Sequence, residues 1–298
     1  MRRIFWAAGI AAVVTMAACT STTPAAQSTR ASSTPPSSAS TPATTAPATS
    51  APPPKPPAPK VSLSSFRAAD GSLVTVARFK GPVTYRLHAG SSDPGAAALS
   101  VVQAGPSIHG HERHHLLAAF NGGFLLSAGV GGYEQEGHVI GPLRPGFASL
   151  VIDQSGAAHI GVWGRTLPQP HEAVYSVRQN LGLLVKKGHP SNASADWTVW
   201  GSTLGGGEAV ARSALGQNAK GELIYAASMS TTPADLAAAL VHAGAVTGME
   251  LDINPEWVQL DVARKPGHGL TAVIPGQNRP AGQYLAGWTR DFITVLAP

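Results

Sequence analysis

Cysteine is almost absent from this sequence, which has a single one, Cys19, among 298 residues. Residues 20–298 therefore contain no intrachain disulfide, no thiolate nucleophile and no cysteine ligand for zinc. A segment as long as residues 61–298 can still bury a large core without such cross-links. We expect one folded domain over residues 61–298.

Charged residues are scarce too, at 12% of the chain, and residues 1–60 contain no acidic residue at all. Five of the 21 Lys and Arg residues lie in that segment, namely Arg2, Arg3, Arg30, Lys55 and Lys60. Subtracting them from 21 leaves 16 basic residues against 16 acidic residues in residues 61–298, which are therefore formally neutral. This balance excludes a basic nucleic-acid-binding domain, so no nucleic-acid partner is expected.

The apolar run near the N-terminus, Ile4 to Ala18, is too short to span a membrane, which takes roughly 20 residues. An arginine pair before this run predicts a signal peptide over residues 1–18. The segment that ends in Cys19, Met16-Ala17-Ala18-Cys19, resembles the lipobox of bacterial lipoproteins. The resemblance implies that Cys19 is lipidated and anchors the protein at the extracytoplasmic face of the cell membrane. The alternative is an ordinary secretory peptide with an incidental cysteine.

Aromatic residues are missing from residues 20–60, where 37 of 41 positions are Ser, Thr, Ala or Pro. Such a composition cannot bury enough apolar surface to offset the entropy lost on ordering the chain. The segment is therefore predicted to be a disordered linker between the membrane anchor and the folded domain.

From Val61 onward, short apolar or alternating runs are separated by glycine, a pattern typical of strands. Asp70-Gly71, Ser155-Gly156 and Lys220-Gly221 stand where hairpin turns are expected. These features predict a single α+β domain with a mixed, strand-rich sheet and few helices. The strands are expected at Leu73–Phe79, Val83–His88, Leu116–Phe120, Ala148–Asp153, Ala158–Trp163, Ala211–Leu215, Leu223–Ala227, Met249–Asn254 and Phe292–Leu296.

One helix is well marked by its ends. Thr232 is a suitable N-cap, Pro233 suits the first helical position, and Gly244 suits the C-terminal end. We expect a strand to begin directly after it, near Val246.

The most promising chemistry lies in Met249–Asn254, where polar and apolar residues alternate. If this segment is a strand, Glu250, Asp252 and Asn254 share one face and form a possible acid/base row. A solvated edge strand would show the same pattern. The continuation adds Glu256 and Trp257, an acid and an indole, which favours a carbohydrate site because aromatic faces pack on sugar rings.

Two further segments are candidates for binding. Asn121, Gly122 and Gly123 follow an apolar run, and glycines there let backbone N–H groups approach a ligand, although a plain tight turn has the same sequence. Arg212 lies in an apolar strand and is costly to bury without an anion, so it is either an anion clamp or an exposed strand residue.

His111-Glu112-Arg113-His114-His115 satisfies the H-E-x-x-H pattern of zinc proteases. That chemistry requires a well-formed helix and a third ligand, whereas glycine and proline precede this segment. A polar surface loop is the favoured interpretation, with a zinc hydrolase using His111 and His115 as the alternative. No metal and no cofactor are expected.

Several short motifs occur in a characteristic order: Asn121-Gly122-Gly123-Phe124, Arg212-Ser213-Ala214-Leu215-Gly216, a capped helix leading to Leu251-Asp252, and Arg290-Asp291-Phe292. In this order the chain resembles the phosphodiester glycosidase family from about Leu116 to Leu296. The resemblance implies hydrolysis of the bond between a sugar's anomeric carbon and a phosphodiester oxygen. The substrate would be a sugar phosphate of envelope or extracellular glycans.

The resemblance also implies roles for individual residues. Asp252 would be the principal catalytic carboxylate, Glu250 or Glu256 would supply a second carboxyl group, and Arg212 would face the phosphate. Asn121, Gly122 and Gly123 would line the substrate site together with Asn254, Glu256 and Trp257. The family commonly has a Gly-Gly-Gly-Ser loop after the aspartate, but this chain has Ile253-Asn254-Pro255-Glu256-Trp257. A non-catalytic glycan-binding envelope protein on the same fold is therefore the alternative.

Overall fold

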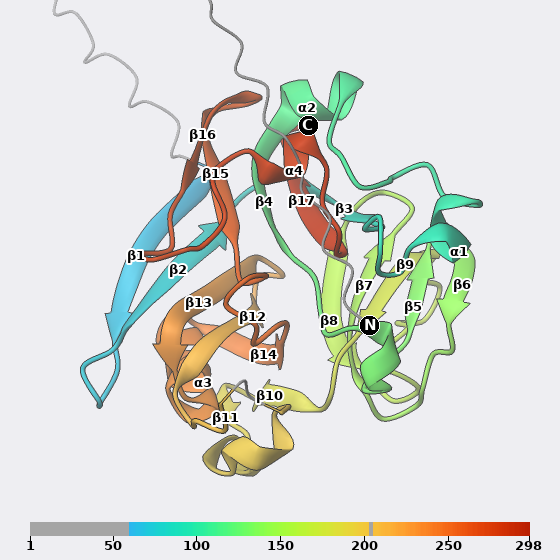
Figure 1. Ribbon diagram of the computed structural model, residues 1–298. Helices are drawn as coiled ribbons and strands as arrows, with labels where there is room; N and C mark the ends of the chain where they lie inside the picture. Colours follow the sequence, from blue (N-terminus) through green and yellow to red (C-terminus); the bar gives the residue numbers. More distant parts are fainter. Residues whose placement is uncertain (1–59, 203–204) are drawn as a thin grey trace, which may run out of the picture. The chain divides into compact units, whose positions relative to one another are not determined.

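Three β-sheets form the framework of the computed structural model, which describes residues 60–202 and 205–298 (Figure 1). A seven-stranded sheet has the order β1 (Val61–Arg67), β2 (Leu73–Phe79), β13 (Leu223–Thr231), β12 (Val210–Asn218), β14 (Ala245–Glu250), β10 (Leu183–Lys186) and β11 (His189–Pro190). A five-stranded sheet has the order β16 (His268–Ala272), β15 (Leu260–Lys265), β4 (Leu116–Asn121), β17 (Phe292–Leu296) and β3 (Thr84–His88). Another five-stranded sheet has the order β6 (His138–Gly141), β5 (Tyr133–Gln135), β9 (Val174–Gln179), β7 (Ala148–Asp153) and β8 (Ala158–Val162).

Helices are few and mostly short, so the prediction of a strand-rich α+β fold is confirmed. The strands divide into three sheets, and the neighbouring strands within them pair antiparallel. The α-helices are α1 (Ala96–Leu99), α2 (Gly110–His115), α3 (Pro233–His242) and α4 (Gln283–Ala286), and the 3-10 helices are η1 (Leu126–Ala128), η2 (Asn192–Ala195) and η3 (Trp197–Val199). The predicted signal peptide, the lipidated Cys19 and the linker up to residue 59 lie outside the described residues.

The helix predicted from its caps is α3. The Thr232 hydroxyl accepts a hydrogen bond from the Asp235 N–H at 3.1 Å, and Gly244 ends the helix with a φ of 92°. The three predicted turns also occur, because Asp70-Gly71, Ser155-Gly156 and Lys220-Gly221 connect β1 to β2, β7 to β8 and β12 to β13. The caps and turns were predictable because each depends on residues that are close together in the sequence.

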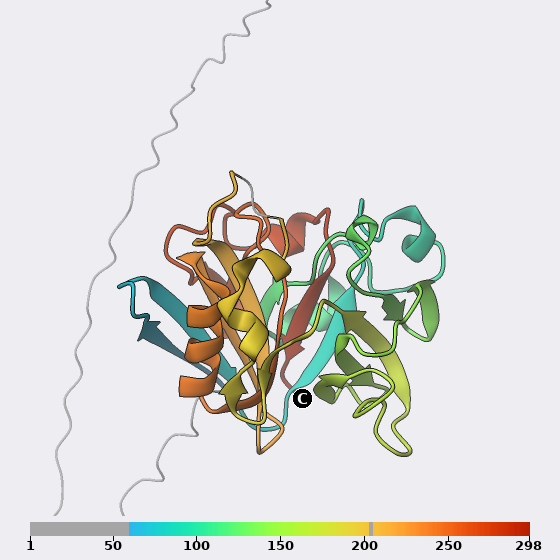
Figure 2. The ribbon, with the colours of Figure 1, turned by 90° about the horizontal axis from the view of Figure 1, so that it is seen from below.

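The core has two main parts on opposite faces of the seven-stranded sheet. In β13, Tyr225 points into the cluster where the three sheets meet, whereas Ile224 and Ala226 point to the cluster under α3. Figure 2 shows α3 lying along that outer face. Because both faces of β13 are buried over its first five residues, these residues, Leu223 to Ala227, are apolar without alternation.

The strand predicted over Met249–Asn254 ends four residues earlier than expected, since β14 covers Ala245–Glu250. Backbone hydrogen bonds to Ser213 continue as far as Asp252, and the Asp252 Oδ1 then accepts hydrogen bonds from the N–H groups of Ile253 at 2.7 Å and Asn254 at 2.9 Å. An aspartate that binds the next two backbone N–H groups in this way turns the chain out of the sheet. The turn brings the side chain of Asp252 to the wall of a pocket.

Candidate functional site

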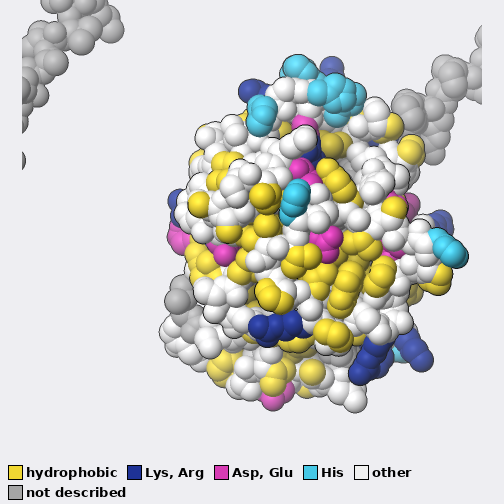
Figure 3. Space-filling view, turned by 90° about the vertical axis from the view of Figure 1, so that its right-hand side faces the viewer, with side chains coloured by type: hydrophobic (Ala, Val, Ile, Leu, Met, Phe, Trp, Pro, Cys, Tyr) yellow, Lys and Arg dark blue, Asp and Glu magenta, His cyan; other side chains and the backbone are white. Residues whose placement is uncertain are grey.

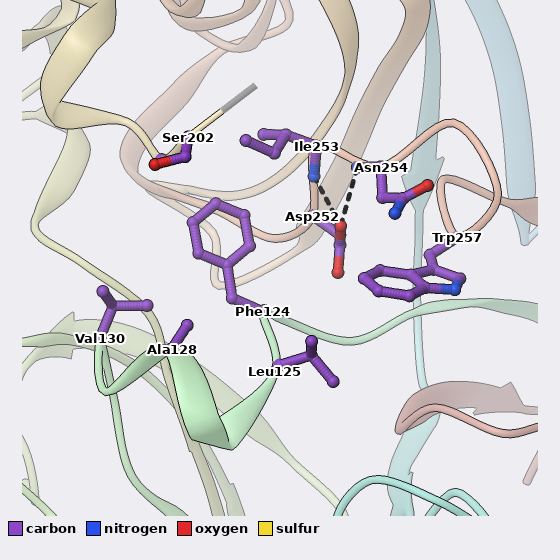
Figure 4. Close-up of a pocket in the computed structure, with 10 residues that line it drawn as sticks. Phe124, Leu125, Ala128, Val130, Ser202, Asp252, Ile253, Asn254 and Trp257 are labelled. Atoms are coloured by element: carbon purple, nitrogen blue, oxygen red, sulfur yellow. Dashed lines mark hydrogen bonds between the residues drawn. The ribbon is translucent and has the colours of Figure 1, made fainter. Parts of the chain in front are cut away.

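A cavity of about 310 Å³ lies beyond the end of β14 (Figure 4). Its volume falls within the range of small-ligand pockets in proteins. Most of the wall is apolar, and Asp252 is the charged residue among those that line it, with Ser202 and Asn254 as polar neighbours. The lining residues are Phe124, Leu125, Ala128, Val130, Gly201, Ser202, Asp252, Ile253, Asn254 and Trp257.

Asp252 is almost fully buried, with 2% of the residue's surface exposed. One oxygen is held by the two backbone N–H groups that end β14, and the other lies 3.5 Å from Nη2 of Arg290. Burial raises the pKa of Asp252 to about 7, while Arg290 and the two N–H donors act in the opposite direction. The group therefore exchanges its proton near neutral pH, as suits an acid/base residue.

Arg290 supplies the positive charge next to Asp252, although it is not among the residues that line the cavity. Its side chain is 4% exposed, and its Nη2 donates to the Gly123 carbonyl at 2.8 Å and lies 3.6 Å from the Asp93 carboxylate. Its Nε and Nη1 have no hydrogen-bond partner among the residues that the structure describes. Trp257 covers the guanidinium, with the ring centroid 4.1 Å from Cζ. Buried N–H donors without partners are unusual and are the donors that an anionic ligand would use.

A second buried ion pair involves Asp291, the residue that follows Arg290. Arg178 donates through Nε to the Asp291 carboxylate at 2.7 Å, and both side chains are at most 2% exposed. Burial acts to lower the pKa of Arg178, but the adjacent Asp291 outweighs it and holds that pKa above its ordinary value. Asp291 follows Arg290 directly, so this pair fixes the chain segment that carries the site's cation.

Gly122 and Gly123 make room for this ion pair and do not line the cavity. A Cβ atom on Gly122 would lie 1.9 Å from the Asp291 carboxylate, and one on Gly123 would lie 2.9 Å from Cζ of Arg178. The sequence indicated close approach of a ligand to these glycines, whereas the structure shows close approach of a buried carboxylate and guanidinium.

We expect Gly122→Ala to destabilise the fold by about 2–4 kcal/mol, because the new methyl group would displace a buried, paired carboxylate. Urea unfolding measures this change in the free energy of unfolding. Gly182→Ala is the matched control, since a Cβ there meets no atom within 4 Å. Equal stability of the two variants would contradict the packing described for Gly122.

Asn121 is also buried beneath the cavity and does not line it. Its Nδ2 donates to the Ser213 hydroxyl at 2.9 Å, and its Oδ1 accepts from the Tyr225 hydroxyl at 2.7 Å. These bonds join β4 to β12 and β13. Asn121 therefore positions the strand end from which Gly122 and Gly123 continue.

Arg212 and Glu250 form a fully buried pair with an Nη1 to Oε1 distance of 2.8 Å. Burial raises the pKa of Glu250 to about 8, and the Arg212 guanidinium opposes that rise. Neither residue lines the cavity, so the structure does not bring them to the pocket face of Asp252. Sequence spacing placed Glu250 and Asp252 on one face, but the strand ends between them.

The segment after Asp252 divides between the pocket and the surface. Asn254 and Trp257 line the cavity, and their role in binding stays a prediction. Glu256 is instead exposed on the surface, where its carboxylate pairs with Arg279 at 2.7 Å. The two candidate second carboxylates, Glu250 and Glu256, thus lie outside the lining of this cavity.

The H-E-x-x-H segment forms the short helix α2 and not the expected loop. Its Glu112 accepts hydrogen bonds from His88 Nε2 and from the Thr294 hydroxyl, each at 2.6 Å, and so is held in the fold. Among the described residues, no group of three or more His, Cys, Asp or Glu side chains is arranged to hold a metal ion.

Sequence reasoning gave no role to three residues of the site. Arg178 carries the same signal as Arg212, an arginine within a strand that is otherwise largely apolar. Arg290 appeared only within a motif of the resemblance. Asp93 had no sequence signal, since it comes from a loop between β3 and α1.

Comparison with known proteins gives distant structural matches only. No family model and no curated protein sequence matches the chain. The catalytic domain of zebrafish N-acetylglucosamine-1-phosphodiester alpha-N-acetylglucosaminidase, auto-inhibited by its pro-peptide, aligns with 80% of this chain and 82% of its own, at 13% identity and a TM-score of 0.48. A hypothetical protein from Synechocystis aligns with 80% of this chain and 62% of its own, at 12% identity and a TM-score of 0.48.

A candidate exported protein from Burkholderia pseudomallei aligns with 76% of this chain and 74% of its own, at 14% identity and a TM-score of 0.41. Matches at this level describe a similarity of backbone arrangement and carry no conclusion about activity. In the part of the chain that the structure covers, no helix is both long and apolar enough to cross a membrane.

Proposed function

We propose that this protein is a hydrolase that cleaves the bond between a sugar's anomeric carbon and a phosphodiester oxygen. The observation that carries the proposal is a buried carboxylate, Asp252, at the wall of the cavity, 3.5 Å from an arginine whose Nε and Nη1 have no partner among the described residues. Such a reaction develops a positive charge on the sugar and a negative charge on the phosphate. Asp252 can stabilise the first charge and Arg290 the second.

The proposed chemistry follows from those charges. As the bond breaks, the sugar becomes an oxocarbenium-like cation, which the carboxylate of Asp252 stabilises as nucleophile, base or electrostatic partner. The departing phosphate gains negative charge, and the N–H groups of Arg290 stabilise it more in the transition state than in the ground state. Arg290 takes the role first assigned to Arg212, because Arg212 is already paired with Glu250.

The proposed substrate is a sugar phosphate of envelope or extracellular glycans. Trp257 presents an aromatic ring at the cavity, and such rings pack on sugar faces. We also propose that the protein is anchored by a lipid on Cys19 at the extracytoplasmic face of the cell membrane. This part of the proposal is based on the sequence motif alone.

The direct test is hydrolysis of a panel of methyl sugar 1-phosphodiesters in ¹⁸O-labelled water. The proposal expects a free sugar labelled at its anomeric oxygen and an unlabelled methyl phosphate. Label in the phosphate would mean cleavage of the P–O bond and would replace the glycosidase by a phosphodiesterase. No turnover on a panel covering hexoses and N-acetylhexosamines would reject the proposed activity.

The rate should rise with pH through an apparent pKa of about 7, because the ionised form of Asp252 does the work and burial raises its pKa to that value. A phosphate leaving group needs little help from a proton donor, so no matching fall is expected just above neutrality. A profile of kcat/KM between pH 5 and 9 measures this. A rate that decreases from pH 5 upward would assign the protonated carboxyl as the working form.

A non-catalytic glycan-binding protein is the second candidate. It is favoured by the lining of the cavity, which contains Asp252 but neither Glu250 nor Glu256. In that case Asp252→Asn would retain glycan binding, measured by calorimetry with the same sugar phosphodiesters, and the native chain would show no turnover.

A further inference from the structure

Histidine side chains gather at one end of the molecule, away from the cavity lining described above. Figure 3 shows them at the upper end of its view, where α2 lies in Figure 1. The tip of the β15–β16 hairpin packs directly on α2, since a Cβ on Gly267 would lie 2.8 Å from the Arg113 carbonyl oxygen. The histidines of α2 and its surroundings are His109, His111, His114, His115 and His268.

Two of these histidines are arranged as a pair. His111 and His115 are four residues apart on α2, so they lie on the same side of the helix. Their rings are stacked, with centroids 4.2 Å apart and an angle of 24° between the ring planes. His111 is exposed and His115 is partly exposed, so water and small ions reach the pair.

The helix that carries the pair is fixed in place by Glu112 and by its C-terminal end. Glu112 pairs with His88 in β3 and Thr294 in β17, at 2.6 Å each. The C-terminal end of α2 is held as well, because the His115 carbonyl accepts a hydrogen bond from the Ala297 N–H at 2.7 Å. The short helix is therefore anchored to its sheet, and the positions of His111 and His115 are set before any ligand binds.

We propose that His111 and His115 bind a divalent transition metal ion of the copper, nickel or zinc class. Imidazole nitrogen is a preferred ligand for all three ions. Metal–nitrogen distances of about 2.0–2.1 Å require the two ligating nitrogens to lie roughly 3 Å apart. Stacked, solvent-accessible rings reach that separation by side-chain rotation alone.

The site would hold its ion by two protein ligands and water, and would exchange it readily. No group of three or more His, Cys, Asp or Glu side chains in the described part of the chain is arranged for a closed site. Glu112, the base of the H-E-x-x-H pattern, is engaged with His88 and Thr294, so the pair is a binding site and not a hydrolytic centre. The proposal is independent of the hydrolase proposed above.

The test is titration of the full chain, without an affinity tag, with zinc chloride in a calorimeter. We expect one zinc ion per chain, with affinity reduced at least about tenfold in His111→Asn and in His115→Asn. His138→Asn, which removes an exposed histidine of β6, is the matched control and should bind zinc as the native chain does. Zinc should also raise the thermal midpoint of the native chain and not that of the two variants.

Three results would overturn the proposal. The first is no saturable zinc binding by the native chain. The second is unchanged affinity in both His111→Asn and His115→Asn, with unfolding midpoints in the absence of metal confirming that both variants are folded. The third is an equal loss in His114→Asn or His268→Asn, which would assign the ion to the wider histidine cluster and not to the pair.

Discussion

An Asp252→Asn variant should hydrolyse a sugar 1-phosphodiester about 10²–10⁴-fold more slowly than the native chain. The substitution keeps the side chain's shape and an acceptor for the N–H groups of Ile253 and Asn254, which now bind Oδ1. It removes the negative charge that would stabilise the developing sugar cation. Initial rates under saturating substrate measure the effect on kcat, and its size exceeds any change expected from packing alone.

The matched control for this variant is Glu256→Gln. Glu256 lies four residues further along the same segment, but its carboxylate is on the surface and pairs with Arg279. Its neutralisation should leave the rate within about twofold, since exposed ion pairs contribute little. Full activity in Asp252→Asn, or an equal loss in Glu256→Gln, would remove Asp252 from the reaction.

Loss of activity in Asp252→Asn should not come from unfolding. The native state holds the Asp252 proton up to about pH 7, because burial raises its pKa from 3.8 to about that value. The native state therefore binds more protons than the unfolded state between these pH values, and Asp252 makes the protein less stable as pH rises through that window. Asparagine does not ionise, so the variant avoids the free-energy cost of a buried charge at this position. It should be at least as stable as the native chain at pH 8.

An Arg290→Gln variant should lose about 10²–10³ in kcat, the usual cost of removing one donor that stabilises transition-state charge. Binding of the intact substrate should weaken less, since the charge on the phosphate oxygen increases only as the bond breaks. Measuring kcat and KM separately distinguishes this from a purely structural loss, and Arg290→Lys should recover part of kcat by restoring the charge without the planar guanidinium.

Arg279→Gln provides the comparison for Arg290. Both guanidinium groups lie over tryptophan rings, Arg279 over Trp288 at 5.2 Å and Arg290 over Trp257 at 4.1 Å. Arg279, however, is 37% exposed and paired with Glu256, whereas Arg290 is buried with two unpartnered groups. If the two substitutions reduced kcat equally, general loss of positive charge would explain the data and Arg290 would have no specific role.

The parts of the fold that sequence predicted well depend on neighbouring residues. The caps of α3 and the glycine turns between paired strands are decided within a few positions of the chain. The exit of the chain after β14 was missed because it depends on a side chain, Asp252, that binds the backbone N–H groups of Ile253 and Asn254. Alternation of polar and apolar residues does not contain that information.

The candidate site was harder to predict because it depends on partners far apart in the chain. Arg178 and Arg212 give the same signal, and only the fold shows that each already has a carboxyl partner, Asp291 and Glu250 respectively. Arg290 differs because Asp252 and Asp93 lie farther away, at 3.5 Å and 3.6 Å, and because two of its donor groups lack partners where Arg212 has one such group. The resemblance contained the segment, and the geometry makes Arg290 the candidate within it.

The way Asp252 is held also indicates how the pocket could be altered by protein engineering. Its carboxylate is oriented by the N–H groups of Ile253 and Asn254, so an insertion or a proline at these positions would misalign it. Trp257 lines the same cavity but takes no part in that arrangement. For the proposed hydrolase, a mutant library aimed at new sugar preferences should therefore vary Trp257 among aromatic residues, which can still cover Arg290, and keep the two residues after Asp252 unchanged.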